Sequence, residues 1–150
     1  MGKSAAKQRI YWFEPWFFLL FGLFHLHRIW GLFDRRGYAG FWLGVLEERG
    51  ALYFALMGLL AALCFAGLWA FFRCRRDNPW WRWLYVFGGG YVLWDLFAIA
   101  AGLDFWRALL YGMFDVSSPL WNLIWGGFTA LGGGVFLLGL FLLRQRTRGL

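Results

Sequence analysis

Residues 50–72 read GALYFALMGLLAALCFAGLWAFF, a run of 23 residues without a charged side chain. About 20 apolar residues in a helix are enough to cross the roughly 30 Å hydrocarbon core of a bilayer. Three further stretches of similar character lie at 15–35, 82–103 and 119–143. The alternation of polar and apolar residues that a transmembrane barrel requires is absent. The sequence therefore predicts an all-α integral membrane protein, a single domain over 1–150 built as a four-transmembrane-helix bundle.

The composition excludes other classes of protein. Of the 150 residues, 61% are hydrophobic, 24% are aromatic and only 15% are charged. A soluble domain of this length could not bury so much apolar surface in one core, and a disordered chain would be poor in aromatic residues. Two cysteines are too few for a disulfide scaffold. A membrane protein is the class that remains, with the lipid bilayer as its first partner.

Two shorter segments, at 38–48 and 105–114, separate the long apolar stretches. Both mix aromatic, apolar and charged residues, and neither is long enough to cross a bilayer. This composition is typical of helices that lie in the membrane interface or of re-entrant loops. We expect one or two short interfacial helices in the outer loops.

The distribution of basic residues predicts the orientation. Most of the 15 Lys and Arg residues fall on the side that holds both termini and the loop between the second and third spans. They are Lys3, Lys7, Arg9, Arg73, Arg75, Arg76, Arg82, Arg144, Arg146 and Arg148. By the positive-inside rule both termini are cytoplasmic, as in a multi-pass protein of a plasma (inner) membrane. This topology accounts for the net charge of +7, so no nucleic-acid partner is predicted.

Small residues recur at helical spacing and predict close helix packing. The second span carries Gly58, Ala62, Ala66 and Ala70 four residues apart, and the fourth carries Gly126, Ala130 and Gly134. Such stripes let helix backbones approach one another, within the chain or in a homo-oligomer. Two glycine triplets, 88–90 and 132–134, favour an alternative in which spans are kinked or broken around a cavity.

Four ionisable residues stand inside the predicted spans, where such groups are costly and face the protein interior or water. They are His25, His27, Arg28 and Asp95. At a rise of about 1.5 Å per residue, His25, Arg28, Asp95 and Asn122 all fall in the outer half of the bundle. His25 and Arg28 share a helix face, as do Tyr91 and Asp95, whereas His27 faces Asp34.

These positions predict a water-accessible pocket that opens outward. In the simplest arrangement Arg28 pairs with Asp95, and the surrounding ligand-binding residues are His25, Tyr91 and Asn122. A structural ion pair that fixes helix register, and a proton relay through His25 and Asp95, are the alternatives. The spacing of the two histidines suits neither haem nor zinc, so no metal site and no cofactor are predicted. No catalytic residue is identified.

The order Trp94-Asp95, Ala98, Gly102, Phe105-Trp106 and Pro119 resembles small lycopene-cyclase-type membrane domains over about 27 residues. The acids that follow the proline in those domains are replaced by Leu120, Trp121 and Asn122. The resemblance implies an isoprenoid-type hydrophobic ligand, and no activity is carried over.

Three functions remain as hypotheses. The first is a protein that binds or transports a small or lipid-like ligand in the polar pocket. The second is an accessory or structural subunit of a larger membrane complex, which the small size and the many aromatic residues support. The third is a membrane-embedded enzyme acting on a lipid or isoprenoid, with Asp95 or His25 as the acid or base.

Overall fold

The computed structural model describes residues 10–73 and 78–148, and its elements there are all helices. They are α1 (Glu14–Leu26), α2 (Ile29–Phe33), α3 (Arg35–Glu48), α4 (Ala51–Arg73), the short 3-10 helix η1 (Trp80–Arg82), α5 (Trp83–Ala101), α6 (Asp104–Met113) and α7 (Trp121–Arg148). Lys3, Lys7, Arg9, Cys74, Arg75 and Arg76 lie outside the described residues, and with them part of the charge pattern that predicts the orientation.

Four helical segments are long and apolar enough to cross a membrane: Glu14–Phe33, Ala51–Arg73, Trp80–Ala101 and Trp121–Arg148. They overlap the four predicted spans, and Pro15 stands in the first turn of α1, where its missing N–H is tolerated. Helices α3 and α6 occupy the two shorter segments. Their position at a membrane interface stays a prediction, as does the cytoplasmic side of the termini.

The first span is not one continuous helix. Helix α1 ends at Leu26, and α2 begins at Ile29 after a tight turn at His27 and Arg28. In that turn the Arg28 N–H donates to the His25 carbonyl at 3.3 Å, and the Gly31 N–H donates to the Arg28 carbonyl at 3.0 Å. These are the shorter i→i+3 bonds of a 3-10 turn, which often marks a functional position within a helix. The break falls at the ionisable residues of this span.

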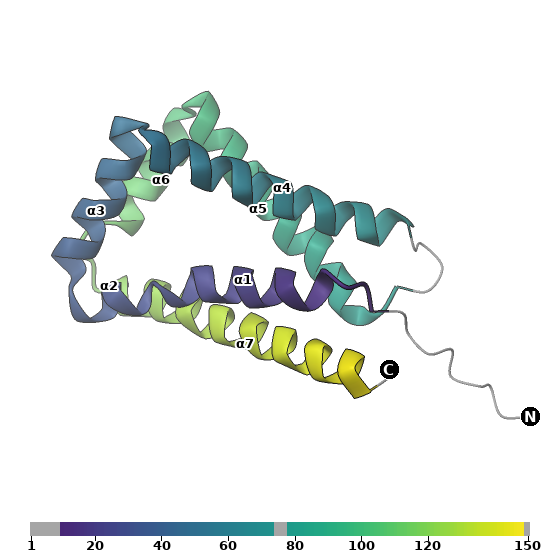
Figure 1. The fold of residues 1–150 in the computed structure, drawn as a ribbon. Helices are drawn as coiled ribbons and strands as arrows, with labels where there is room; N and C mark the ends of the chain where they lie inside the picture. The colour runs from purple at the N-terminus through teal and green to yellow at the C-terminus, as the bar shows by residue number, and fades with distance from the viewer. Residues whose placement is uncertain (1–9, 74–77, 149–150) are drawn as a thin grey trace, which may run out of the picture.

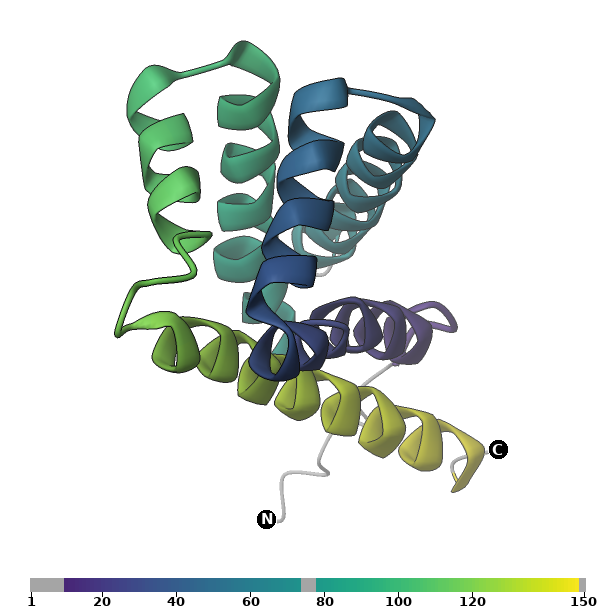
Figure 2. The ribbon, with the colours of Figure 1, turned by 90° about the vertical axis from the view of Figure 1, so that its left-hand side faces the viewer.

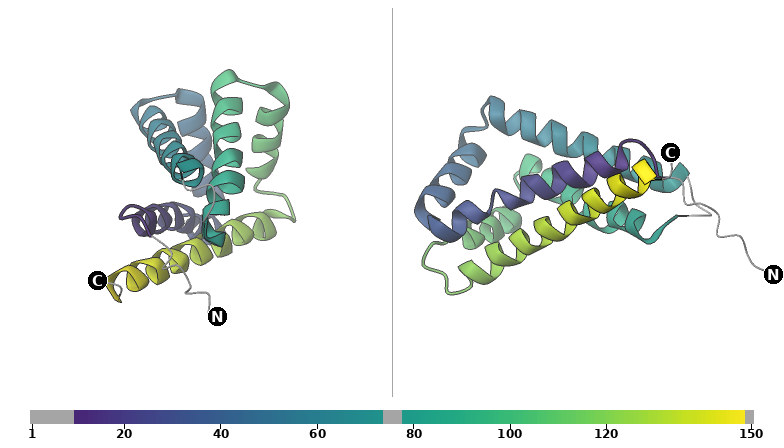
Figure 3. Two further views of the ribbon diagram at one scale, coloured as in Figure 1. Left: turned by 90° about the vertical axis from the view of Figure 1, so that its right-hand side faces the viewer. Right: turned by 60° about the horizontal axis from the view of Figure 1, so that its bottom comes forward.

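Helices α1 and α7 form the most extensively packed pair, and they lie side by side in Figures 1 and 3. Glycine makes their approach possible. A Cβ atom at Gly132 would stand 2.6 Å from the Cβ of His25, and one at Gly22 would stand 2.5 Å from the backbone nitrogen of Phe136. Both distances are below any real contact, so only glycine allows this separation of the two backbones.

Helices α4 and α5 form the second pair. Here the ring of Tyr85 lies against Gly67, and Cys64 lies against Gly89. Helix α5 runs without interruption through 88–90, and α7 through 132–134. The alternative that the triplets break their spans is therefore wrong, and Gly89 and Gly132 serve helix packing instead.

The predicted small-residue stripes do not pack inside the chain. Of the four residues of the α4 stripe, Ala70 is buried, whereas Gly58, Ala62 and Ala66 are exposed. On α7 a Cβ at Gly126 or Gly134 would meet nothing within 4 Å. The interior faces of these helices are instead marked by residues such as Cys64 and Gly67 on α4 and Trp125 and Gly132 on α7.

The two helix pairs are joined at one end by a buried ion pair. Arg82, at the start of α5, donates from Nε to Glu14 Oε1 at 2.7 Å and from Nη2 to Glu14 Oε2 at 3.0 Å. Glu14, at the start of α1, also accepts from the Tyr11 backbone at 2.7 Å and from the Tyr85 hydroxyl at 3.4 Å. Both charged side chains are buried. Because each begins a span, α1 and α5 start at the same end of the molecule.

From this junction the two pairs splay apart, and α3 and α6 lie at the far, wide end (Figures 1 and 2). The chain passes through the same sequence of elements twice: a span (α1 or α5), a short helix (α3 or α6) and a returning span (α4 or α7). The packed pairs α1–α7 and α4–α5 correspond to each other in these two halves. The structure therefore has a repeat of topology that the amino-acid pattern does not reveal.

Candidate ligand cavity between the helix pairs

A cavity of about 240 Å³ lies between the two helix pairs. Its walls come from the spanning helices α1, α4, α5 and α7, from the His27–Arg28 turn, and from the short helices α3 and α6. Most of the lining side chains are aliphatic or aromatic, including Phe24, Met57, Leu60 and Leu131. An apolar cavity of roughly 150 Å³ is enough to hold benzene, so this one has room for a larger hydrophobic group.

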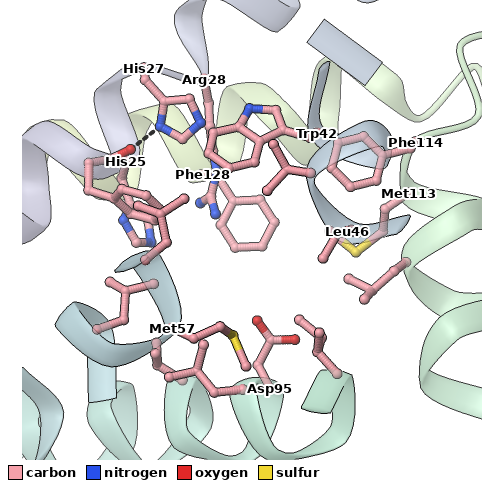
Figure 4. Close-up of a pocket in the computed structure, with 18 of the residues that line it drawn as sticks. His25, His27, Arg28, Trp42, Leu46, Met57, Asp95, Met113, Phe114 and Phe128 are labelled. Atoms are coloured by element: carbon pink, nitrogen blue, oxygen red, sulfur yellow. Dashed lines mark hydrogen bonds between the residues drawn. The ribbon is translucent and has the colours of Figure 1, made fainter. Parts of the chain in front are cut away.

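Ionisable side chains stand on facing walls of this cavity, as Figure 4 shows. Arg28 lies on one wall together with Trp42 and Phe128, and Asp95 lies on the opposite wall beside Met57. Arg28 belongs to the turn between α1 and α2. Asp95 is carried by the middle of α5.

Arg28 and Asp95 do not form the predicted ion pair. In the described parts of the chain, the one ion pair within 4 Å is the pair between Glu14 and Arg82. Asp95 Oδ1 accepts instead from the indole Nε1 of Trp106 on α6, at 2.7 Å. The Arg28 guanidinium lies over the ring of Phe128, 4.4 Å from its centre, and 5.7 Å from the ring centre of Trp125. Aromatic faces attract a cation, but they accept none of its in-plane N–H groups.

Buried donors without a partner gather at the cavity. The Nε and Nη1 atoms of Arg28 and the Nε1 atom of Trp42 are buried and have no hydrogen-bond partner in the described structure. Leaving such a group unsatisfied costs about 1–3 kcal/mol, and more where it is charged. All three are donors and all belong to cavity-lining residues. These three donors at the Arg28 wall are therefore each left without an acceptor.

The two histidines are held by the helix that carries them. His25 is buried against α7, and its Nδ1 lies 3.1 Å from the Phe21 carbonyl. His27 Nδ1 contacts the Phe24 carbonyl, while its Nε2 lies 3.4 Å from the Tyr38 hydroxyl. The predicted partner of His27, Asp34, caps α3 through the Gly37 N–H at 2.9 Å. That interpretation is wrong because α3 folds back and brings Tyr38 to His27.

Tyr38 closes the cavity from α3 and is itself buried. Burial raises the pKa of its phenol to about 12, and the nearby positive charge of Arg28 only partly opposes this shift. The hydroxyl is therefore protonated at any physiological pH. It stands at the wall that also carries His27 and Arg28, where it can donate or accept a hydrogen bond.

Four of the five predicted ligand-binding residues line one cavity: His25, Arg28, Tyr91 and Asp95. Asn122 does not. It is exposed, and its Oδ1 accepts from Arg35 Nη2 at 3.0 Å at the start of α7. The face of α7 that meets the cavity is the one that carries Trp125, Phe128 and Leu131. The depth of Asn122 stays a prediction, and the rotation of α7 is set by its packing on α1.

Sequence reasoning missed Trp42 and Trp106, which supply an unpaired donor and the partner of Asp95. Both lie on the short helices, and nothing in their spacing indicates that α3 and α6 fold over the cavity. In the described residues no group of three or more His, Cys, Asp or Glu is placed to hold a metal ion. Comparison with family models, with curated proteins and with solved structures finds no match to this chain.

Proposed function

We propose that this chain is a membrane protein that binds a small lipid-like molecule in the cavity between its two helix pairs. The apolar part of the molecule would lie among side chains such as Met57, Leu60 and Leu131, and its polar end would lie between Arg28 and Asp95. The observation that carries the proposal is the cavity itself, which is apolar over most of its walls and has unsatisfied polar groups at one place. This combination is typical of ligand pockets.

The size of the cavity limits the class of molecule. A volume of about 240 Å³ lies just below the usual range of ligand pockets, roughly 300 to 1,000 Å³. A single short chain or a small ring system fits this space, whereas a two-chain phospholipid does not. Entry from the outer half of the membrane agrees with the predicted orientation, in which α3 and α6 lie on the outer side.

The proposal is tested by filling the cavity. Gly88 lines it, and a Cβ at this position would meet nothing within 4 Å, so Gly88→Leu places a side chain in the open space without displacing backbone. Gly90→Leu is the matched control, because Gly90 lies on the same helix, has equally open surroundings and does not line the cavity.

Native mass spectrometry of each protein, extracted gently from its own membrane, gives the readout. We expect the wild type and Gly90→Leu to carry the same small bound mass and Gly88→Leu to have lost it. An equal bound mass in all three would overturn the proposal. Stoichiometric co-purification of another protein with no bound small molecule would also contradict it, and would favour the accessory-subunit hypothesis.

A further inference from the structure

The unsatisfied groups at the cavity are all of one kind. Arg28 contributes Nε and Nη1, and Trp42 contributes Nε1, each buried and without a partner. In the described residues no buried side-chain oxygen at the cavity is left in the same condition. The missing partner is therefore an acceptor with more than one lone pair. A carboxylate or a similar oxygen anion meets this requirement, and a hydroxyl or an amine meets it less well.

The charges of the cavity point to the same end group. The Arg28 guanidinium lies over the faces of Phe128 and Trp125, and its Nε and Nη1 groups have no hydrogen-bond partner. Asp95 on the facing wall already accepts a short hydrogen bond from Trp106. A cationic ligand at the second oxygen of Asp95 would meet the positive charge of Arg28 and would leave the donors of Arg28 and Trp42 without an acceptor. An anion at Arg28 satisfies these donors, and the gain from charge-assisted hydrogen bonds must exceed the repulsion from Asp95 on the facing wall.

We propose that the ligand of this cavity is a single-chain amphiphile with an anionic oxygen head, a carboxylate in the simplest case. Its head accepts hydrogen bonds from Arg28 and from the indole N–H of Trp42. Its chain extends among the apolar residues between α4 and α7. This inference rests on the proposed function and adds the chemical class of the head group.

The experiment compares three probes of equal chain length: decanoic acid, decanol and decylamine. Each competes at neutral pH against a photoreactive decanol that bears a diazirine on its chain, with the protein in lipid nanodiscs. Labelled peptides are quantified by mass spectrometry. The decanol probe reports whether the cavity accepts an apolar chain, and the order of the competitors reports the preferred head group.

We expect labelling at cavity residues and displacement by decanoate at a concentration at least about tenfold lower than decanol, because hydrogen bonds to charged groups are the stronger ones. Decylamine is expected to be the weakest competitor. Equal displacement by all three would overturn the anionic head and leave the proposed function standing. Absence of labelling in the cavity would overturn both.

Two variants test the donors. In Arg28→Gln we expect the preference for decanoate over decanol to disappear, whereas Arg36→Gln, which changes an exposed arginine on α3, keeps it. Trp42→Phe retains an aromatic ring and removes the N–H, and should lower the preference several-fold. Its control is Trp81→Phe, which removes the unpaired indole N–H outside the cavity.

The variant Asp95→Asn tests whether the head group of the ligand is an anion or a cation. Removing this negative charge should leave decanoate binding unchanged or tighter, since an anion at Arg28 loses a repulsive neighbour. If Asp95→Asn instead abolished binding of the preferred competitor, the head would be a cation and the inference would be wrong. If Arg28→Gln fails to fold, the comparison of Trp42→Phe with Trp81→Phe and the result for Asp95→Asn still test the anionic head group.

Discussion

Two charged residues, Glu14 and Arg82, contribute more to the architecture than their positions in the sequence suggest. Their buried, two-bond pair joins the first turn of α1 to η1, directly before α5, and further hydrogen bonds from Tyr11 and Tyr85 satisfy Glu14. Asn78 links the same arginine to the end of α4, because it accepts from Arg82 and donates to the Phe71 carbonyl at 2.9 Å. A buried charge stripped of its partner is strongly destabilising.

We therefore expect Glu14→Gln to lower the free energy of unfolding by about 3–5 kcal/mol, since it leaves the buried Arg82 without its counter-charge. Thermal unfolding in detergent, followed by circular dichroism, measures the change. Glu48→Gln is the control, because Glu48 is exposed at the end of α3. Replacement of both partners by Met should cost less than the single change. Equal stability of Glu14→Gln and Glu48→Gln would contradict the role given to the pair.

At the scale of the helices, glycine decides how closely α1 and α7 approach. Gly22, Gly132 and Gly139 each stand where a Cβ would meet the partner helix at 2.8 Å or less. Neighbouring glycines on α7 face open space. In the triplet at 132–134, Gly132 is therefore needed for the contact with α1, whereas Gly133 and Gly134 have room for a larger side chain.

This contrast gives a matched pair of variants. Gly132→Ala forces a methyl group against His25 and should destabilise the protein by about 1–3 kcal/mol, as overpacking does. Gly133→Ala meets nothing within 4 Å and should be neutral or slightly stabilising, because alanine has the better helix propensity. The two melting temperatures, measured side by side, provide the check. A loss of stability in Gly133→Ala equal to that in Gly132→Ala would show that the close approach is not what matters.

At the scale of the whole molecule, the two halves, each a span, a short helix and a returning span, build the cavity where they face each other. Both halves begin at the end that holds Glu14 and Arg82, so α3 and α6 close the opposite, wide end (Figure 1). The polar groups of the cavity consequently lie nearer to α3 and α6 than to the junction.

The predicted orientation puts this wide end outside the cell. Two single cysteines, Ser117→Cys after α6 and Thr147→Cys near the end of α7, test it in a background that carries Cys64→Ala and Cys74→Ser. A membrane-impermeant maleimide applied to intact cells should label position 117, and it should reach position 147 only after the membrane is opened. The reverse pattern would invert the orientation, and labelling of both positions in intact cells would contradict the four-span topology.

Much of the fold follows from sequence alone, because the requirement for about 20 apolar residues in a membrane-crossing helix is a local property of the chain. The four apolar stretches and the two shorter segments that α3 and α6 occupy could all be located in this way. Depth is local too, since the rise per residue is fixed. The rise per residue predicted that His25, Arg28, Asp95 and Asn122 all lie in the outer half of the bundle, and the first three of them line the cavity.

The tertiary structure decided which faces meet, since helix rotation depends on the packing of a partner that lies far away in the chain. Asn122 turned away from the cavity, and the stripes of Gly58 and Gly126 turned outward, because Gly132 and Gly67 fix the rotation of α7 and α4. Asp95 accepts a hydrogen bond from Trp106 instead of pairing with Arg28, because α6 folds back over α5. The unpaired donors of the cavity became visible only with every partner in place.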